Sequence, residues 1–239
     1  MTEWFRDSFG EDYLRLYPHR NDEEAERITA LIVRTVGLEP GWRVLDVACG
    51  AGRHARAFRR VGAECVGLDL SAVLLRVAQA TTDAWLVRAD MRRIPVRPCS
   101  MHLVVNLFTS FGYFERDEEH ALALTEMTAA LRPGGWFVID FLNPAAVRAG
   151  LVPRETVALG DGEPAHVTRS MSPDGRHVIK TIDSASRSYV ERVRLFRPDE
   201  MTAMLEARGI AVSHRFGDYD AGRPSDASPR SILMGRSPA

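Results

Sequence analysis

Apolar runs and amphipathic stretches alternate along the chain from residue 22 to residue 142. Short runs rich in Val, Leu, Ile and Phe are typical of strands buried on both faces, and apolar residues at helical spacing are typical of covering helices. This alternation predicts βαβ units and a mostly parallel sheet with helices on both sides. The expected strands are 43–48, 64–70, 84–89, 101–108 and 136–142, and the expected helices are 22–36, 53–61, 72–79 and 118–131.

The pattern changes after Pro144, where polar and apolar positions alternate and β-branched residues are frequent. A tight turn at 173–175 separates the first two of these segments, so we expect an antiparallel meander. Pro198 then suits the first position of a helix. The expected elements are the meander strands 165–172, 176–183 and 187–196, a helix from Pro198 to Arg208, and final strands at 210–217 and 231–235.

A glycine-rich turn follows the first expected strand. The segment VLDVACGAGRHA (44–55) places an acid at a strand end, then Gly50 and Gly52, then a helix. Glycines allow positive φ and close approach of a ligand, and a helix N-terminus presents free N–H groups. Such a turn suits a nucleotide-like ligand at the carboxyl edge of the sheet. Taken alone, the turn also satisfies the dinucleotide fingerprint and is compatible with a purely structural role.

Three carboxylates near strand ends bear on this choice. Asp69 closes the second strand, where a carboxylate can accept hydrogen bonds from both ribose hydroxyls of any nucleotide cofactor. Asp46 is not required by the dinucleotide fingerprint, and it can meet the ammonium of an amino-acid cofactor. Asp90 can accept a hydrogen bond from an adenine amine, with Met91 and Ile94 beside the ring, although turn chemistry alone also explains an aspartate in this loop.

At these residues the sequence resembles the class I S-adenosylmethionine (SAM)-dependent methyltransferases. The likeness is carried by VLDVACGAGRHA, VGLDLSAVLLRVA, RADMRRIPV and LRPGGWFVIDF, in the family's order and spacing, and it is strongest over residues 22–142. It implies a Rossmann-like, doubly wound α/β fold whose seven-stranded, mostly parallel sheet has an antiparallel last strand. The small antiparallel meander is an insertion after the fifth strand. The implied parts are a lid arm (1–21), a SAM-binding domain (22–143 and 197–239) and an inserted β subdomain (144–196).

The resemblance also implies a set of cofactor-binding residues. The glycine turn and Asp46 would hold the methionine part, Asp69 the ribose, and Asp90 with Met91 the adenine. Ala48 stands where many family members have glycine. Tyrosines and an arginine of the arm would close over the cofactor carboxylate, with Arg53 and His54 as rival partners. Aromatic packing of an amphipathic arm is the alternative for Tyr13 and Tyr17. The full set is Asp46, Ala48, Gly50, Gly52, Asp69, Leu70, Asp90, Met91, Asn106, Tyr13, Tyr17, Arg20 and Arg53.

The acceptor side carries weaker signals. The fourth strand ends in NLFTSFGYF (106–114), without the Asn-Pro-Pro-Tyr-like element of many DNA or protein amine methyltransferases. This aromatic and hydroxylic mixture resembles the same segment of enzymes that methylate small metabolites, including N,N-dimethyltransferases of amino sugars. Packing of the rings between sheet and helix is the alternative. The candidate substrate contacts are Phe108, Phe111, Tyr113, Asp140, Asn143 and Arg192, and no catalytic base stands out.

Composition narrows the range of partners. The 239 residues include 31 basic and 32 acidic ones, which gives a net charge of −1. The chain therefore lacks the excess of positive charge that is typical of a duplex-binding protein, and nucleic acid is disfavoured as a partner.

Metal binding and membrane insertion are also not expected. The cysteines form no CxxC pair and the histidines show no ligand spacing, so no metal is expected. No run of about 20 apolar residues would span a membrane, which makes the cytoplasm the default location. Related enzymes sometimes dimerise through the inserted region, so a homodimer is one expectation.

We therefore expect a SAM-dependent methyltransferase that modifies an N or O atom of a small molecule. An NAD(P)-dependent oxidoreductase and a SAM-binding module without turnover are the alternatives. The oxidoreductase is disfavoured because no tyrosine has a lysine four residues on, Lys180 being the sole lysine of the sequence.

Overall fold

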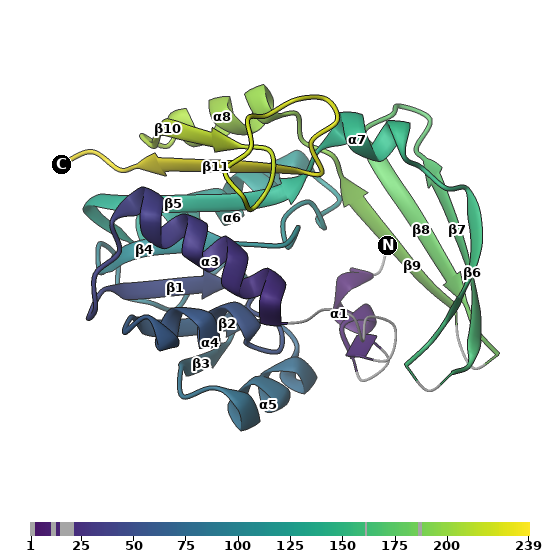
Figure 1. Cartoon of the computed structure of the whole chain (residues 1–239), viewed down its shortest axis with the longest axis horizontal. Coiled ribbons are helices and arrows are strands. Elements are labelled where there is room, and N and C mark those ends of the chain that lie inside the picture. Colours follow the sequence, from purple (N-terminus) through teal and green to yellow (C-terminus); the bar gives the residue numbers. More distant parts are fainter. Residues whose placement is uncertain (1–2, 11–12, 15–21, 161, 186–187) are drawn as a thin grey trace.

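The chain folds around two separate β-sheets (Figure 1). The computed structural model describes all residues except 1–2, 11–12, 15–21, 161 and 186–187. The larger sheet has seven strands in the order β10-β11-β5-β4-β1-β2-β3. Its strands are β1 (Arg43–Val47), β2 (Glu64–Asp69), β3 (Trp85–Arg88), β4 (Met101–Asn106), β5 (Leu131–Leu142), β10 (Ala211–Phe216) and β11 (Arg230–Arg236).

The strand pairing of the large sheet confirms the predicted fold class. Strand β1 pairs in parallel with β2 on one side and β4 on the other, and β5 continues the parallel series beside β4. Strand β11 is antiparallel to both of its neighbours, β5 and β10. The carboxyl ends of β1 to β4 therefore meet at one edge, which is where ligands bind in open α/β sheets.

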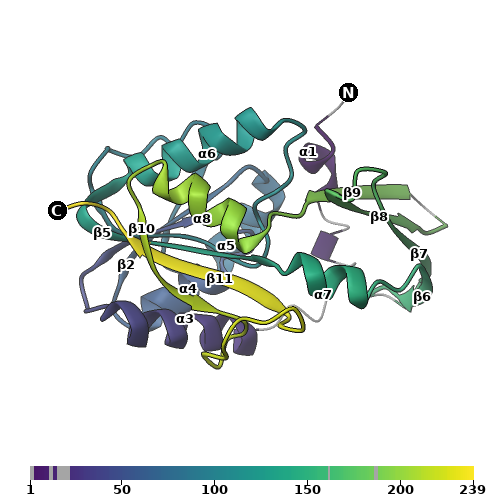
Figure 2. The same ribbon diagram turned by 90° about the horizontal axis from the view of Figure 1, so that it is seen from above.

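Helices cover both faces of this sheet (Figure 2). One face packs against α3 and α4, where Ile28, Ile32 and Phe58 meet the sheet core, and the other packs against α6 and α8 through Leu124 and Met201. Burial of these apolar stripes is what stabilises the amphipathic helices. The helices are α1 (Phe5–Ser8), α3 (Asp22–Val36), α4 (Arg53–Arg60), α5 (Ala72–Thr81), α6 (Asp117–Ala129), α7 (Pro144–Ala149) and α8 (Pro198–Glu206).

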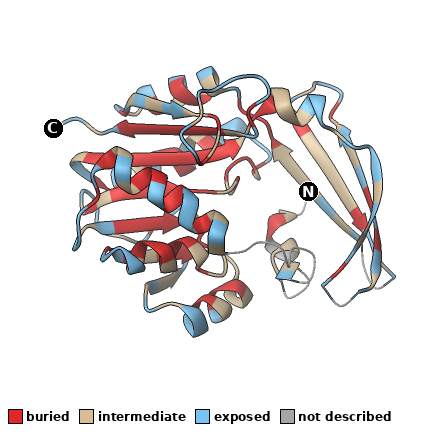
Figure 3. Ribbon diagram, viewed as in Figure 1, coloured by how far each residue is buried: buried red, intermediate tan, exposed pale blue. Residues whose placement is uncertain are grey.

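The smaller sheet is antiparallel and has four strands rather than the predicted three. Its order is β6-β7-β8-β9, with β6 (Arg154–Ala158), β7 (Pro164–Met171), β8 (His177–Asp183) and β9 (Ser188–Arg194). Strand β6 escaped prediction because none of its five residues is buried, so hydrophobic periodicity gives it no signal. Figure 3 shows the same contrast across the molecule, with the large sheet buried and the small sheet mostly half-buried or exposed.

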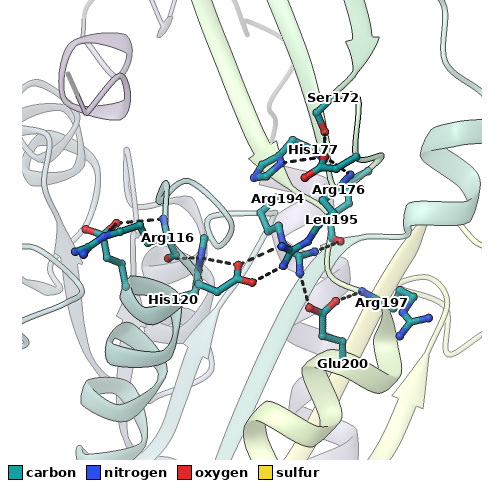
Figure 4. A network of polar contacts seen from close by, with 12 residues as sticks. Arg116, His120, Ser172, Arg176, His177, Arg194, Leu195, Arg197 and Glu200 are labelled. Atoms are coloured by element: carbon teal, nitrogen blue, oxygen red, sulfur yellow. Dashed lines mark hydrogen bonds and ion pairs between the residues drawn. The ribbon is translucent and has the colours of Figure 1, made fainter. Parts of the chain in front are cut away.

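A polar junction joins the small sheet to the large one at Arg194, the last residue of β9 (Figure 4). Its guanidinium pairs with Asp117 at the start of α6 and with Glu200 in the first turn of α8, and it donates a hydrogen bond to the Leu195 carbonyl at 2.7 Å. The side chain is only 4 % exposed. One buried cation thus joins α6 to β9 and α8, which follow it much later in the sequence.

The first described segment of the chain lies between the two sheets (Figure 1). The rings of Trp4 and Phe9 contact Tyr113, with centroids 5.1 and 5.5 Å apart, and Phe5 meets Phe114 edge-on at 5.6 Å. None of the described helices has the length and hydropathy needed to cross a membrane.

Candidate active site

A cavity of about 270 Å³ lies at the carboxyl edge of the large sheet. Its walls come from the turns after β1, β2, β3 and β4, from α4 and α5, and from the arm. Ten of the sequence-predicted residues line it, namely Tyr13, Ala48, Gly50, Arg53, Asp69, Leu70, Asp90, Met91, Phe108 and Tyr113.

The turn after β1 has the backbone shape that the sequence predicted, with φ of 61° at Ala48, 55° at Gly50 and 79° at Gly52. The Gly50 N–H donates a 2.8 Å hydrogen bond to Asp69, which ties the turn to the end of β2. A Cβ on Gly50 would meet only Leu74 at 3.8 Å, so the turn is open here. A Cβ on Gly52 would lie 2.9 Å from the Ala78 Cβ, so Gly52 permits packing against α5 and does not line the cavity.

Asp46 does not line the cavity, but it carries the most perturbed carboxylate next to it. The residue is 1 % exposed, and neither carboxylate oxygen has a hydrogen-bond partner among the described residues. Burial, with the nearby charge of Asp69, raises the pKa of Asp46 to about 7, although the charge of Arg53 and the dipole of the nearby Ala55 N–H oppose the shift. A buried, unsatisfied carboxylate is costly, and a cationic ligand group beside it would remove that cost.

Asp69 lies at the cavity wall with part of its hydrogen-bonding capacity in use. One oxygen accepts from the Gly50 N–H and the other from the Ser71 N–H, each at 2.8 Å. A carboxylate has about four lone-pair sites, so acceptor capacity remains for hydroxyl groups of a ligand. Burial raises its pKa, against the effect of these two N–H donors.

Asp90 lines the cavity and is bound by Arg92. The Arg92 guanidinium donates to both oxygens of Asp90, at 3.0 and 2.6 Å, and also pairs with Glu3 of the arm and with Glu119 of α6. An adenine amine would therefore share Asp90 with this arginine, which sequence spacing did not reveal.

Three predicted residues lie behind the cavity wall. Asn106 is fully buried and donates to the Val47 carbonyl at 3.0 Å. Asn143 caps α7 and donates to backbone carbonyls of the loop between β10 and β11, including that of Ser228 at 2.8 Å. Asp140 is 0 % exposed and pairs with Arg230. Their positions at strand ends correctly predicted the edge of the sheet on which they lie. A strand-end position does not distinguish a residue that lines the cavity from one that supports the lining.

The turn after β4 is strained and forms part of the cavity wall. Phe108 and Thr109 have φ of 58° and 62°, so the strand ends at Asn106 and not at the predicted residue 108. Left-handed φ is unfavourable for residues with a Cβ. The ring of Phe108 faces the Arg53 guanidinium at 4.1 Å. In contrast, Phe111 is buried against Phe196 and His120 and does not line the cavity.

The remaining predictions fall on the small sheet and the arm. Arg192 lies on β9 with its guanidinium 3.3 Å from His177, on the opposite face of the strand from Tyr189 and Glu191. It does not line the cavity. Tyr17 and Arg20 lie outside the described residues, while Tyr13 is part of the cavity wall.

Sequence reasoning missed the arm residues Phe5 and Phe9, which also line the cavity. The Ser71 hydroxyl, which caps α5 at the Leu74 N–H, donates to the Phe9 carbonyl at 2.5 Å. The aromatic spacing of the arm was the available signal, but an amphipathic arm gives no indication of the surface on which it lies.

Comparison with known proteins gives the same family from three directions. A family model described as a methyltransferase domain matches residues 44–135. The chain is 29 % identical over 202 residues to a dTDP-3-amino-3,4,6-trideoxy-alpha-D-glucopyranose N,N-dimethyltransferase of Streptomyces venezuelae, covering 80 % of this chain and 81 % of that protein. It is 31 % identical over 223 residues to a malonyl-[acyl-carrier protein] O-methyltransferase of Enterobacter lignolyticus, covering 91 % and 82 %.

Solved structures agree on the fold. The CcbJ methyltransferase from Streptomyces caelestis matches with a TM-score of 0.81 at 21 % identity, covering 100 % of both chains. Streptomyces venezuelae DesVI matches with a TM-score of 0.68 at 26 % identity, covering 98 % of this chain and 95 % of that one. An α/β sheet with a glycine turn, carboxylates at successive strand ends and a cavity between them defines a nucleotide-cofactor enzyme. The chain belongs to the class I SAM-dependent methyltransferase family, and SAM is its cofactor. The alternative of an NAD(P)-dependent oxidoreductase is therefore wrong.

Proposed function

We propose that this enzyme transfers the methyl group of SAM to the nitrogen of a small-molecule amine. The observation that carries this proposal is the aromatic lining of the cavity near β4 and the arm. The rings there are those of Phe5, Phe9, Tyr13, Phe108, Tyr113 and Phe114. Aromatic faces attract alkylated ammonium groups, which is the form that an amine acquires as it is methylated.

The distribution of titratable groups also supports an amine. An alcohol or phenol must lose its proton to a base during transfer, whereas a neutral amine attacks through its lone pair. Among the described lining residues, the acids and the histidine come from elements other than the arm and the turn after β4: Asp22 on α3, His54 on α4, Asp69 at the end of β2 and Asp90 after β3. The S. venezuelae relative, named as an N,N-dimethyltransferase of an amino sugar, is a precedent for such an acceptor.

The residues that line the cavity, together with the buried Asp46 next to Asp69 and Arg53, fit the cofactor that the family uses. The unsatisfied Asp46 carboxylate suits the ammonium of SAM, the free acceptor capacity of Asp69 suits the ribose, and Met91 with Asp90 suits the adenine. SAM supplies a methyl group already activated on a sulfonium, so the chain has chiefly to align the acceptor and exclude water. Alignment of this kind contributes on the order of 7–11 kcal/mol.

We further propose that the parts of the chain have separate tasks. Residues 22–143 and 197–239 form the SAM-binding domain, the arm (1–21) acts as a lid, and the inserted subdomain (144–196), whose strand β9 contacts the arm at α1, bounds the acceptor side. The contacts of Trp4 and Phe9 with Tyr113, together with the Glu3–Arg92 ion pair, support the lid because they seat the arm on the cavity wall.

Matched substrates test the amine assignment. The protein is incubated with methyl-labelled SAM and with pairs of metabolites that differ only in an amino or a hydroxyl group, and products are identified by mass. We expect label on the amines and none on their hydroxyl partners. Transfer to the hydroxyl compounds alone would contradict the proposal. Asp69→Ala is the control, and it should weaken SAM binding by about 1.5–3 kcal/mol, as expected for lost hydrogen bonds to a charged group.

A further inference from the structure

We propose that Asp140, Tyr219 and Arg230 form a positioning unit that holds the ring of Phe108 in the cavity wall. Asp140 belongs to β5, Arg230 begins β11, and Tyr219 lies in the loop between β10 and β11. None of the three lines the cavity. They act on the site through the backbone turn after β4, so they are positioning residues and not catalytic ones.

Both carboxylate oxygens of Asp140 accept hydrogen bonds from the turn or from the other two residues of the unit. One oxygen accepts from the Phe108 N–H at 2.9 Å and from the Tyr219 hydroxyl at 2.8 Å. The other accepts from the Arg230 Nε at 2.7 Å. The Asp140 carbonyl accepts from the Thr109 N–H at 3.0 Å. Both strained residues of the turn are therefore hydrogen-bonded to one buried aspartate.

Arg230 adds further contacts to the same turn. Its Nη2 donates to the Thr109 hydroxyl at 2.9 Å, and its guanidinium carbon lies 5.3 Å from the centre of the Phe108 ring. The ring is thus shared by Arg230 and by Arg53, whose guanidinium carbon is 4.1 Å away. Since Arg53 starts the helix after the glycine turn, Phe108 connects the cofactor turn to the unit.

A turn with two consecutive left-handed residues persists only where surrounding structure enforces it. Here the enforcement comes from a fully buried carboxylate, whose charge would be costly without its cation and donors. Loosening the unit should let Phe108 leave its position while the sheet remains intact. A displacement of about 1 Å near reacting groups can slow a reaction on the order of a hundredfold.

Tyr219→Phe tests the proposal because it removes a single hydroxyl and keeps the ring. The matched control is Thr202→Val, which deletes a buried hydroxyl donor of α8 that bonds to the Pro198 carbonyl at 2.8 Å. The reporter is the fluorine NMR signal of 4-fluorophenylalanine placed at Phe108, with the same label at Phe137 of β5 as a reference in the core. Neither signal depends on turnover.

We expect the signal at 108 to shift or broaden in Tyr219→Phe while the signal at 137 stays unchanged, and both to stay unchanged in Thr202→Val. We expect kcat to fall about tenfold in Tyr219→Phe, with the KM for SAM within twofold of the unmodified enzyme. An unchanged signal at 108 would overturn the proposal, as would a changed signal with kcat preserved or equal disturbance at 108 and 137.

The kinetic arm rests on the proposed amine methylation, whereas the NMR arm does not. If the unmodified enzyme transfers no methyl group to any amine, the proposed function fails, and the signal at Phe108 alone decides the positioning unit.

Discussion

At the scale of single residues, Asp46 makes the clearest link between burial and ligand affinity. Its pKa of about 7 in the ligand-free protein means that the neutral acid predominates in mildly acidic solution. An ammonium prefers the ionised form, so ligand binding must expel the proton. We expect the affinity for S-adenosylhomocysteine, which keeps that ammonium, to fall as pH drops below about 7, by up to about tenfold per pH unit.

Calorimetry between pH 5.5 and 8 measures this dependence. Asp46→Asn should lose most of the acid limb, and an affinity that is flat from pH 5.5 to 7 in the unmodified protein would contradict the assignment. The same raised pKa predicts that the ligand-free protein loses stability as pH rises from about 4 through 7, since the folded state holds the proton more tightly.

Single residues also show where sequence reasoning stops. Asp46 and Gly50 were identified because a strand end and a required φ leave a mark in the sequence. Asp140 and Asn143 also lie at a strand end, yet Asp140 supports the turn after β4 and Asn143 holds the loop between β10 and β11. The difference depends on Arg230 and on loop carbonyls about 80–90 residues away, which no local pattern contains.

At the scale of secondary-structure elements, the junction around Arg194 sets how the small sheet is attached (Figure 4). The neighbouring His120 is fully buried, and burial lowers its pKa to about 4, so it is neutral at pH 7 and adds no positive charge. Arg194→Leu removes the cation that joins α6, β9 and α8. We expect a loss of about 2–3 kcal/mol of unfolding free energy, typical of buried hydrogen bonds to charged groups.

Arg176→Leu provides the matched control. Arg176 also pairs with Asp117, but its side chain is 47 % exposed, so its removal should cost about 0–1 kcal/mol. Urea unfolding of both variants measures the difference. Equal losses would show that the burial of Arg194 is not what holds the junction.

Elements also mark the boundary of what the sequence predicts. Strands β1, β2, β4 and β5 and helices α3, α4 and α6 were predicted because both patterns, buried runs and amphipathic faces, are strong there. Strand β6 and helix α7 were missed, the first because its burial is only partial and the second because it has six residues. Their existence is decided by the neighbouring strand and by the Asn143 cap.

At the scale of the whole molecule, the arm forms part of the cavity wall although it is distant in sequence from the strand-end turns. Its Phe9 carbonyl is bonded to Ser71 and its Glu3 to Arg92, while its rings cover Tyr113 and Phe114. Deletion of residues 1–10 removes all of these contacts. We expect S-adenosylhomocysteine to dissociate about tenfold faster, since about 1.4 kcal/mol corresponds to a factor of ten.

Stopped-flow displacement measures that rate. Glu3→Gln alone, which removes one partly exposed ion pair, should change it little. A truncated protein that releases the ligand at the unmodified rate would show that the arm does not retain it. The sheet topology and the edge of the sheet that holds the cavity could be predicted from the sequence. The surface on which the arm packs and the shape of the acceptor side could not, because they depend on tertiary packing.

The position of β11 has a consequence for biosynthesis. This strand lies between β5 and β10, yet it is the last of the seven to be made. Until residue 236 has left the ribosome, β5 presents an unpaired edge, and Arg230 is not yet available to neutralise the charge of Asp140. The nascent chain can therefore complete its large sheet only after β11 has left the ribosome, so the charge of Asp140 and the open edge of β5 are satisfied in the same late step.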